Sequence, residues 1–212
     1  LKRVSLELGG KSAAIVLEDA DLAATVEGLK FLSVMNSGQA CVAQSRVLAP
    51  RSRYEEVVEA LAAGIGGMQV GDPMDPATEV GPMVAQRQQE RVAKYIALGQ
   101  EEGARLVTGG VGMPDGLDRG WYVRPTVFAD VDNRMRIAQE EIFGPVMTVQ
   151  RFTDEAEAIF DFDALLDEAG KPLLKVARYR PASDHFIVTP ATPRQKEEWD
   201  AMKGVKLHVS RS

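Results

Sequence analysis

The feature that most constrains the fold of this chain is an alternation of short apolar runs with longer stretches of helical periodicity. Apolar runs of strand length lie at residues 13–17, 46–49 and 146–152. Between them, over residues 22–36 and 54–68, apolar residues recur every three or four positions, which is the spacing of an amphipathic helix. Strands that alternate with helices predict an α/β domain with a mainly parallel sheet flanked by helices.

The same alternation continues through the middle of the chain. A helix is expected over residues 85–102, and strands are expected over residues 4–8, 104–108 and 121–128. Pro125 lies inside the last of these strands. Because proline has no N–H to donate to a neighbouring strand, we expect that strand at a sheet edge or at a bulge.

The last quarter of the chain differs in composition from the rest. Residues 1–159 carry a net charge of −7, whereas residues 160–212 carry a net charge of +1. A helix is expected to begin at Thr192, with proline at its first position, and a short strand is expected over residues 205–209. We therefore predict two parts: a domain portion over 1–159 and a divergent α+β tail of unknown role over 160–212.

Composition excludes several classes of function. The net charge of −6 disfavours binding to nucleic acid or to anionic membranes. The longest apolar runs are too short to span a bilayer, and no signal-peptide pattern opens the chain. The single cysteine cannot form an internal disulfide, and no cysteine–histidine cluster has metal-ligand spacing. We therefore predict a cytoplasmic protein with no metal, nucleic acid or membrane partner.

That single cysteine, Cys41, lies in the segment NSGQACVAQSR between a predicted helix and a predicted strand. Taken alone, a lone cysteine is more often a buried, inert small residue than a nucleophile. Glu7, in a predicted strand, is more often a surface carboxylate, and Lys11 is expected to be a solvated lysine beside a turn. A functional role for these residues is indicated only when the segments that contain them are considered together.

Three segments occur in a fixed order: LELGGKS at residues 6–12, GQAC at 38–41 and EEIFGPV at 140–146, with Cys41 34 positions after Glu7. In these motifs, residues 1–159 resemble the aldehyde dehydrogenase superfamily. The resemblance implies the fold of that family's catalytic domain, apparently incomplete here. Family members carry a dinucleotide-binding domain ahead of the first motif and continue past the third, and the tail does not resemble that continuation.

The resemblance also implies a reaction and a set of site residues. The reaction is the oxidation of a small-molecule aldehyde to a carboxylic acid with hydride transfer to NAD or NADP. Cys41 would be the nucleophile that forms a thiohemiacetal and then a thioester, and Glu7 the general base that activates water to hydrolyse it. Glu141 would bind the nicotinamide ribose, while Phe143 and Leu8 would lie beside the nicotinamide ring.

Two alternatives remain open at this point. The chain could be a truncated or rearranged remnant of the family that binds no cofactor and is inactive or acts as an interaction module. It could instead be a thiol esterase, which needs Cys41 and a base but no cofactor. A homo-oligomer also remains open.

Overall fold

The computed structural model describes residues 3, 5 and 9–153, together with strand segments at 165–166, 172–174, 176–181, 186–190 and 208–209. The chain divides into two compact units, residues 1–151 and residues 152–211, which are described separately below. The expected boundary at residues 159–160 falls outside the described residues and stays a prediction. Among the described helices, none is both long and apolar enough to cross a membrane.

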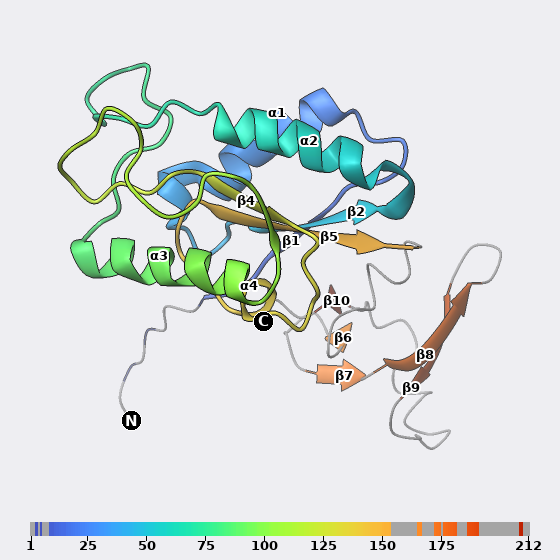
Figure 1. The fold of residues 1–212 in the computed structure, drawn as a ribbon. Coiled ribbons are helices and arrows are strands. Elements are labelled where there is room, and N and C mark those ends of the chain that lie inside the picture. The colour runs from blue at the N-terminus through green and yellow to red at the C-terminus, as the bar shows by residue number, and fades with distance from the viewer. Residues whose placement is uncertain are drawn as a thin grey trace. The chain divides into compact units, whose positions relative to one another are not determined.

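The first unit is built around a five-stranded sheet with the strand order β1-β2-β5-β4-β3 (Figure 1). Strand β1 pairs in parallel with β2, strand β4 pairs in parallel with β5, and β3 pairs antiparallel with β4 at one edge. The strands are β1 (Ala13–Ile15), β2 (Arg46–Pro50), β3 (Arg105–Thr108), β4 (Thr126–Ala129) and β5 (Val146–Phe152). The α/β class is therefore confirmed, and the sheet is mixed at its β3 edge.

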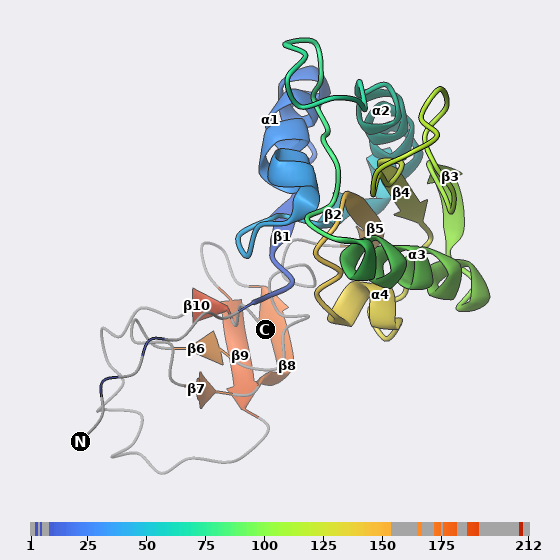
Figure 2. The same cartoon turned by 90° about the vertical axis from the view of Figure 1, so that its left-hand side faces the viewer.

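Helices cover both faces of this sheet. Helices α1 (Leu22–Val34) and α2 (Tyr54–Gly66) lie on one face, and α3 (Gln86–Glu101) and the short α4 (Arg136–Gln139) lie on the other (Figures 1 and 2). Asp21 caps α1 by accepting a hydrogen bond from the backbone N–H of Ala24 at 3.1 Å, which satisfies one of the free N–H groups of the first turn.

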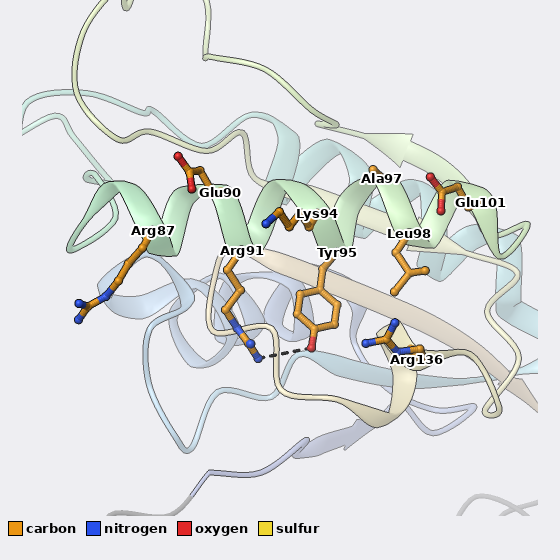
Figure 3. A pocket seen from close by; sticks show the side chains of 9 residues that line it. All are labelled: Arg87, Glu90, Arg91, Lys94, Tyr95, Ala97, Leu98, Glu101 and Arg136. Atoms are coloured by element: carbon orange, nitrogen blue, oxygen red, sulfur yellow. Dashed lines mark hydrogen bonds between the residues drawn. The ribbon is translucent and has the colours of Figure 1, made fainter.

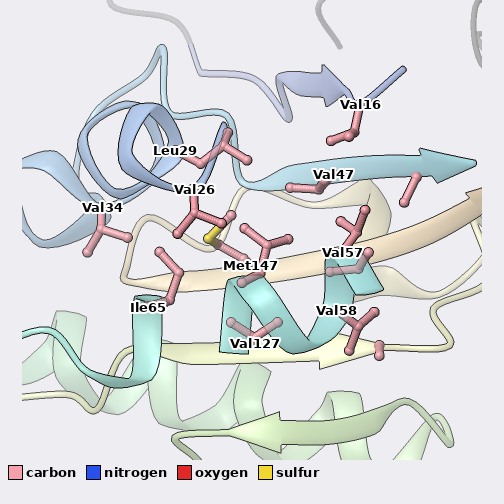
Figure 4. Packing of buried hydrophobic residues seen from close by; sticks show 14 of the residues in the cluster. Val16, Val26, Leu29, Val34, Val47, Val57, Val58, Ile65, Val127 and Met147 are labelled. Atoms are coloured by element: carbon pink, nitrogen blue, oxygen red, sulfur yellow. The ribbon is translucent and has the colours of Figure 1, made fainter. Parts of the chain in front are cut away.

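The strand residues alternate between two hydrophobic clusters. In β4, Val127 and Ala129 belong to the cluster under α1 and α2, whereas Phe128 belongs to the cluster under α3 and α4. This period of two is the side-chain period of a strand that is buried on both faces. Figure 4 shows the first cluster, in which Val26 of α1 and Ile65 of α2 approach Met147 of β5, among other apolar residues. Full burial of each such side chain contributes roughly 1.5–3 kcal/mol to folding.

The predicted strand over residues 121–128 is shorter than expected. Strand β4 begins at Thr126, so Pro125 lies just before the strand instead of inside it. The expectation of an edge position is also wrong, because β4 lies between β5 and β3. The irregularity falls instead in the pairing of β3 with β4, where the register shifts between Leu106 and Thr108. Proline cannot donate a ladder hydrogen bond, which explains why the strand starts after it.

The remaining expectations have mixed outcomes. The strand over 146–152 is confirmed, and the run at 13–17 forms a strand over only its first three residues. The helix expected over 22–36 ends at Val34, because the chain then turns into the left-handed region at Asn36. The strand expected at 4–8 and the helix expected from Thr192 lie outside the part of the chain that the structure describes.

In the second unit the described segments are short strands. Strand β6 (Leu165–Leu166) lies between β10 (His208–Val209) and β7 (Pro172–Leu174) and pairs antiparallel with both. Strands β8 (Val176–Pro181) and β9 (Phe186–Pro190) form an antiparallel pair, which the sequence pattern did not predict.

Candidate active site

Cys41 lies in the loop between α1 and β2, and its side chain is exposed. The neighbouring Val42 is exposed as well, whereas Ala43 is buried and anchors the loop. The interpretation of Cys41 as a buried residue is therefore wrong, since the thiol is accessible to solvent. An accessible thiol is a requirement for a nucleophile.

A strained turn precedes the cysteine. Asn36, Ser37 and Gly38 all have left-handed backbone angles, with φ of 51°, 58° and 70°. Two reciprocal hydrogen bonds close this turn: the Asn36 amide donates to the Gln39 carbonyl, and the Gln39 amide donates to the Asn36 carbonyl, each at 3.0 Å. Non-glycine residues in this region are costly and persist where the surroundings impose them, which is common at functional sites.

Further contacts fix the turn to the rest of the unit. The Ser37 hydroxyl donates to the carbonyl of Gly81 at 2.9 Å, and the backbone N–H of Val84 donates to the side-chain oxygen of Gln39 at 2.9 Å. Gly38 lies against Gly144, so that a Cβ at residue 38 would be 2.1 Å from the Gly144 carbonyl oxygen. The cysteine loop therefore touches the loop that contains Glu141 and Phe143.

That second loop follows α4 and leads into β5. The Glu141 carboxylate accepts a hydrogen bond from the backbone N–H of Gly10 at 3.3 Å. It also lies over Gly9, where a Cβ would be 2.2 Å from a carboxylate oxygen. Glu141 is thus held against the segment that carries the first sequence motif.

Helix α3 holds the same loop from the other side through its backbone carbonyls. The Gln88 side-chain amide donates to the carbonyl of Phe143 at 2.7 Å, and the Arg91 guanidinium donates to the carbonyl of Glu141 at 2.6 Å. Phe143 itself has a left-handed φ of 63°. Sequence reasoning missed Gln88 and Arg91, and no sequence signal marks them, because their partners are main-chain atoms.

The first glutamate of the motif has a different role from the second. Glu140 accepts hydrogen bonds from the Arg136 guanidinium at 2.7 Å and from the Tyr95 hydroxyl at 2.6 Å. These bonds, that from Arg136 first, lower the pKa of Glu140 to about 2. Burial and the bond to Glu140 raise the pKa of Tyr95. Glu140 therefore ties α4 to α3.

A small cavity joins the three motifs. It has a volume of about 10 Å³, roughly the space of one water molecule. Gly10 lines it from the first motif, Gly38 and Ala40 from the cysteine loop, and Glu141 and Phe143 from the third motif. The cavity thus brings together Glu141, Phe143 and the loop that carries Cys41, although Cys41 itself does not line it. Glu7 and Leu8 themselves lie outside the described residues, directly before Gly9.

A larger groove, of about 740 Å³, runs along the outer face of α3 (Figure 3). Arg91, Tyr95 and Arg136 line it, with Arg91 over the Tyr95 ring at 5.0 Å from the ring centre. None of the predicted site residues that the structure describes, Cys41, Glu141 and Phe143, lines this groove. Glu141 and Phe143 line the smaller cavity, and Cys41 lines neither, so the smaller cavity is the better candidate for the cofactor contacts.

Lys11 is buried, with 2% of its surface exposed, so the expectation of a solvated lysine is wrong. Its amine has no hydrogen-bond partner among the described groups. Burial, together with the positive charge of Arg46, lowers the pKa of Lys11 to about 7, and the carboxylate of Glu141 opposes this change.

Comparison with known proteins identifies the family. The model described as "Aldehyde dehydrogenase family" matches residues 1–163. Geranial dehydrogenase of Castellaniella defragrans is 57% identical over 159 residues, which cover 75% of this chain and 33% of that protein. A putative aldehyde dehydrogenase of Staphylococcus saprophyticus is 48% identical over 158 residues, 74% of this chain and 33% of that protein.

Solved structures agree with this result. An aldehyde dehydrogenase of Mycobacterium tuberculosis complexed with NAD+ is 58% identical, with a TM-score of 0.70 over 72% of this chain and 32% of that one. A mutant aldehyde dehydrogenase C of Pseudomonas syringae, complexed with NAD+ and octanal, is 45% identical, with a TM-score of 0.72 over 75% and 33%. The chain spans about one third of the length of the relatives it matches. By its sequence motifs, its fold and these matches, the chain belongs to the aldehyde dehydrogenase family.

Proposed function

We propose that this chain carries the nucleophile and the nicotinamide-ribose contacts of an enzyme that oxidises an aldehyde to a carboxylic acid. The observation that carries the proposal is the common cavity, in which the loop of an exposed cysteine faces Glu141 and Phe143. The family membership favours this function over that of an interaction module without catalysis.

Oxidation begins at Cys41. Its thiolate attacks the aldehyde carbon, a C–S bond forms, and the carbonyl electrons move to oxygen to give a thiohemiacetal alkoxide. The alkoxide then re-forms the C=O bond as hydride leaves the carbon for the nicotinamide ring, and a thioester on Cys41 remains. The fixed turn over residues 36–39 keeps the nucleophile in one place during both steps.

Hydrolysis then releases the product, and we assign its general base to Glu7. The Glu7 carboxylate takes a proton from water, the resulting hydroxide adds to the thioester carbon, and the C–S bond breaks. The carboxylic acid leaves, and the Cys41 thiolate is regenerated.

The residues present fit a nicotinamide cofactor, which supplies the carbon that accepts hydride. Gly10 provides the one hydrogen bond that described groups donate to the Glu141 carboxylate. A carboxylate has about four lone-pair positions, so Glu141 can also accept hydrogen bonds from both hydroxyls of a ribose. We assign Phe143, which is half-buried at the same cavity, to the ring, and Leu8 to its other side.

For the cofactor and the substrate, we propose NAD+ and an apolar aldehyde. Two solved relatives are complexes with NAD+, one of them with octanal as well, and another relative is a geranial dehydrogenase. We also propose a cytoplasmic location and leave a homo-oligomer as a prediction.

The test mixes the chain with NAD+ and either octanal or geranial and follows the absorbance of the reduced nicotinamide. We expect aldehyde-dependent reduction that falls at least about 1000-fold in Cys41→Ser, since a hydroxyl is a far weaker nucleophile than a thiolate. Parallel assays with NADP+ test the cofactor choice. An unchanged rate in Cys41→Ser, or no cofactor binding by the chain, would contradict the proposal.

The exposed thiol also supports a second, lesser activity, the hydrolysis of activated esters without cofactor. An aryl acetate that releases a coloured phenol is a suitable probe. Hydrolysis that is lost in Cys41→Ser supports this activity, whereas hydrolysis that survives the substitution rejects it.

A further inference from the structure

Cys41 lies on a tight turn of the backbone. The N–H of Ala43 donates to the carbonyl of Ala40 at 3.0 Å, which closes a β-turn with Cys41 at its second position. Just after this turn, the Ser33 hydroxyl of α1 donates to the carbonyl of Gln44 at 2.7 Å. Helix α1 therefore fixes the C-terminal end of the turn that carries the nucleophile.

Gln39 fixes the other end of the turn. Only 9% of its surface is exposed. Its side-chain amide donates to the Asn36 carbonyl at 3.0 Å, and its side-chain oxygen accepts from the backbone N–H of Val84 at 2.9 Å. Its own backbone carbonyl accepts from the Asn36 amide at 3.0 Å. Because both the donor and the acceptor of the Gln39 side chain are used, its orientation is fixed.

The bond from Val84 connects the cysteine turn to helix α3. Val84 lies just before α3, which begins at Gln86, and Gln88 in the first turn of this helix donates to the Phe143 carbonyl at 2.7 Å. The start of one helix therefore holds both the cysteine turn and the loop of Phe143. Through Gln39, the position of the nucleophile is tied to that of the loop that we assign to the cofactor.

We propose that Gln39 is a positioning residue for the nucleophile, whose side-chain amide holds the turn of Cys41 at the distance from the cofactor loop that hydride transfer requires. This inference rests on the proposed function, in which the carbon bound to Cys41 gives hydride to the nicotinamide ring. Gln39 acts through the backbone of the turn and takes no part in the chemistry. A misplacement of about 1 Å between reacting groups can lower a rate about 100-fold.

The rigidity of the turn can be measured without any activity, because the chain has a single cysteine. A nitroxide label on Cys41 reports its motion through the line shape of the EPR spectrum. We expect broad lines from a restrained label in the parent chain. Narrower lines are expected in Gln39→Met, which keeps the length of the side chain but makes neither of its hydrogen bonds. Equal line widths in the two proteins would overturn the proposal.

Gln89→Met is the matched control for this comparison. Gln89 is also partly buried, and its side-chain amide donates to a backbone carbonyl, that of Tyr122, at 2.8 Å. Its bonds do not involve the cysteine turn. The spectrum of the label in Gln89→Met should therefore equal that in the parent chain.

Hydride transfer is then measured in a single turnover with saturating NAD+ and octanal. We expect Gln39→Met to be about 100-fold slower than the parent chain, with an unchanged Kd for NAD+. Gln89→Met should match the parent in both quantities. A merely structural role of Gln39 would not produce this split, because Phe143 and its loop are held by α3 and not by Gln39.

Asn36→Gly is a second variant that should fold, since glycine readily adopts the φ of 51° at this position. It removes the donor to the Gln39 carbonyl and should also slow hydride transfer, by less than Gln39→Met. If Gln39→Met does not fold, Asn36→Gly decides by the same two measurements.

Two results would refute the positioning role: hydride transfer in Gln39→Met at the rate of the parent, or a loss of rate that Gln89→Met reproduces. If the parent chain transfers no hydride to NAD+, the proposed function fails. The EPR comparison still decides in that case whether Gln39 fixes the turn of Cys41.

Discussion

The two loops that meet at the small cavity are built in different ways. The cysteine loop is held by its own side chains, through the reciprocal bonds of Asn36 and Gln39, and leaves Cys41 exposed. The loop of Glu141 and Phe143 is held from outside, by Gln88 and Arg91 of α3. A nucleophile needs an accessible side chain on a rigid loop, whereas a residue that contacts a cofactor needs an orientation that the neighbouring elements impose.

The largest expected effect comes from breaking the contact between the loops. Gly38→Ala would place a methyl group 2.1 Å from the Gly144 carbonyl oxygen at a residue with φ of +70°. We expect the free energy of unfolding to fall by more than about 3 kcal/mol, because neither backbone can retreat cheaply. Urea denaturation measures it. Gly28→Ala is the control: it lies in α1 with no atom near its Cβ position, and it should stabilise by about 0.5–1 kcal/mol. A fully stable Gly38→Ala would contradict the described contact.

The next effect concerns the buried Lys11, which precedes β1. The Lys11 pKa falls from 10.5 to about 7 on folding, so between those values the unfolded chain holds a proton that the native chain releases. The stability of the parent chain should therefore rise with pH from 7 to 10.5. Lys11→Met should lack this rise and be more stable by about 2–4 kcal/mol at pH 7. Denaturation curves across this window provide the measurement, and parallel pH profiles of the two proteins would disprove the expectation.

A smaller effect concerns the scaffold of the cofactor loop. Gln88→Leu removes the donor to the Phe143 carbonyl and should cost about 1 kcal/mol of stability. It should also raise the KM for NAD+ several-fold. The rate at which a thiol reagent alkylates Cys41 should change little, because Gln88 does not touch the cysteine loop. Gln86→Leu, at an exposed position of the same helix, is the control. The comparison of the two loops fails if Gln88→Leu lowers the rate of Cys41 alkylation and leaves the KM unchanged.

The smallest effect is that of Glu140, which is bonded to Arg136 and Tyr95 near the surface. Its pKa is about 2 in the folded chain and 4.5 in the reference state, so its stabilisation is present above pH 4.5 and is lost as the pH falls toward 2. Glu140→Gln should remove about 0.5 kcal/mol at pH 7 and nothing at pH 2. Thermal melts at both pH values test this, and an equal difference at the two would count against it.

The sequence pattern predicted the strands and helices of the first unit well, because strands that are buried on both faces, such as β4 and β5, are short, largely apolar runs between stretches of helical periodicity. It failed at Pro125, because this proline precedes the strand, which begins at Thr126, instead of lying inside it. It also failed for Lys11, since burial of a charged residue depends on distant neighbours such as Arg46 and Glu141. The motifs predicted Cys41, Glu141 and Phe143 as site residues, whereas residues that bond to main-chain atoms, such as Gln88, leave no trace in the sequence.

The proposed function requires that Cys41 forms a covalent acyl intermediate beside the Glu141 cavity. The most direct test incubates the chain with NAD+ and octanal, stops the reaction with acid, and measures the mass of the peptide that contains Cys41. We expect an octanoyl group on that cysteine in the parent chain, which accumulates further in Glu7→Gln and is absent in Cys41→Ser. Reduction of NAD+ by octanal with an acyl group on a different residue, or with Cys41 unmodified in Glu7→Gln, would contradict it.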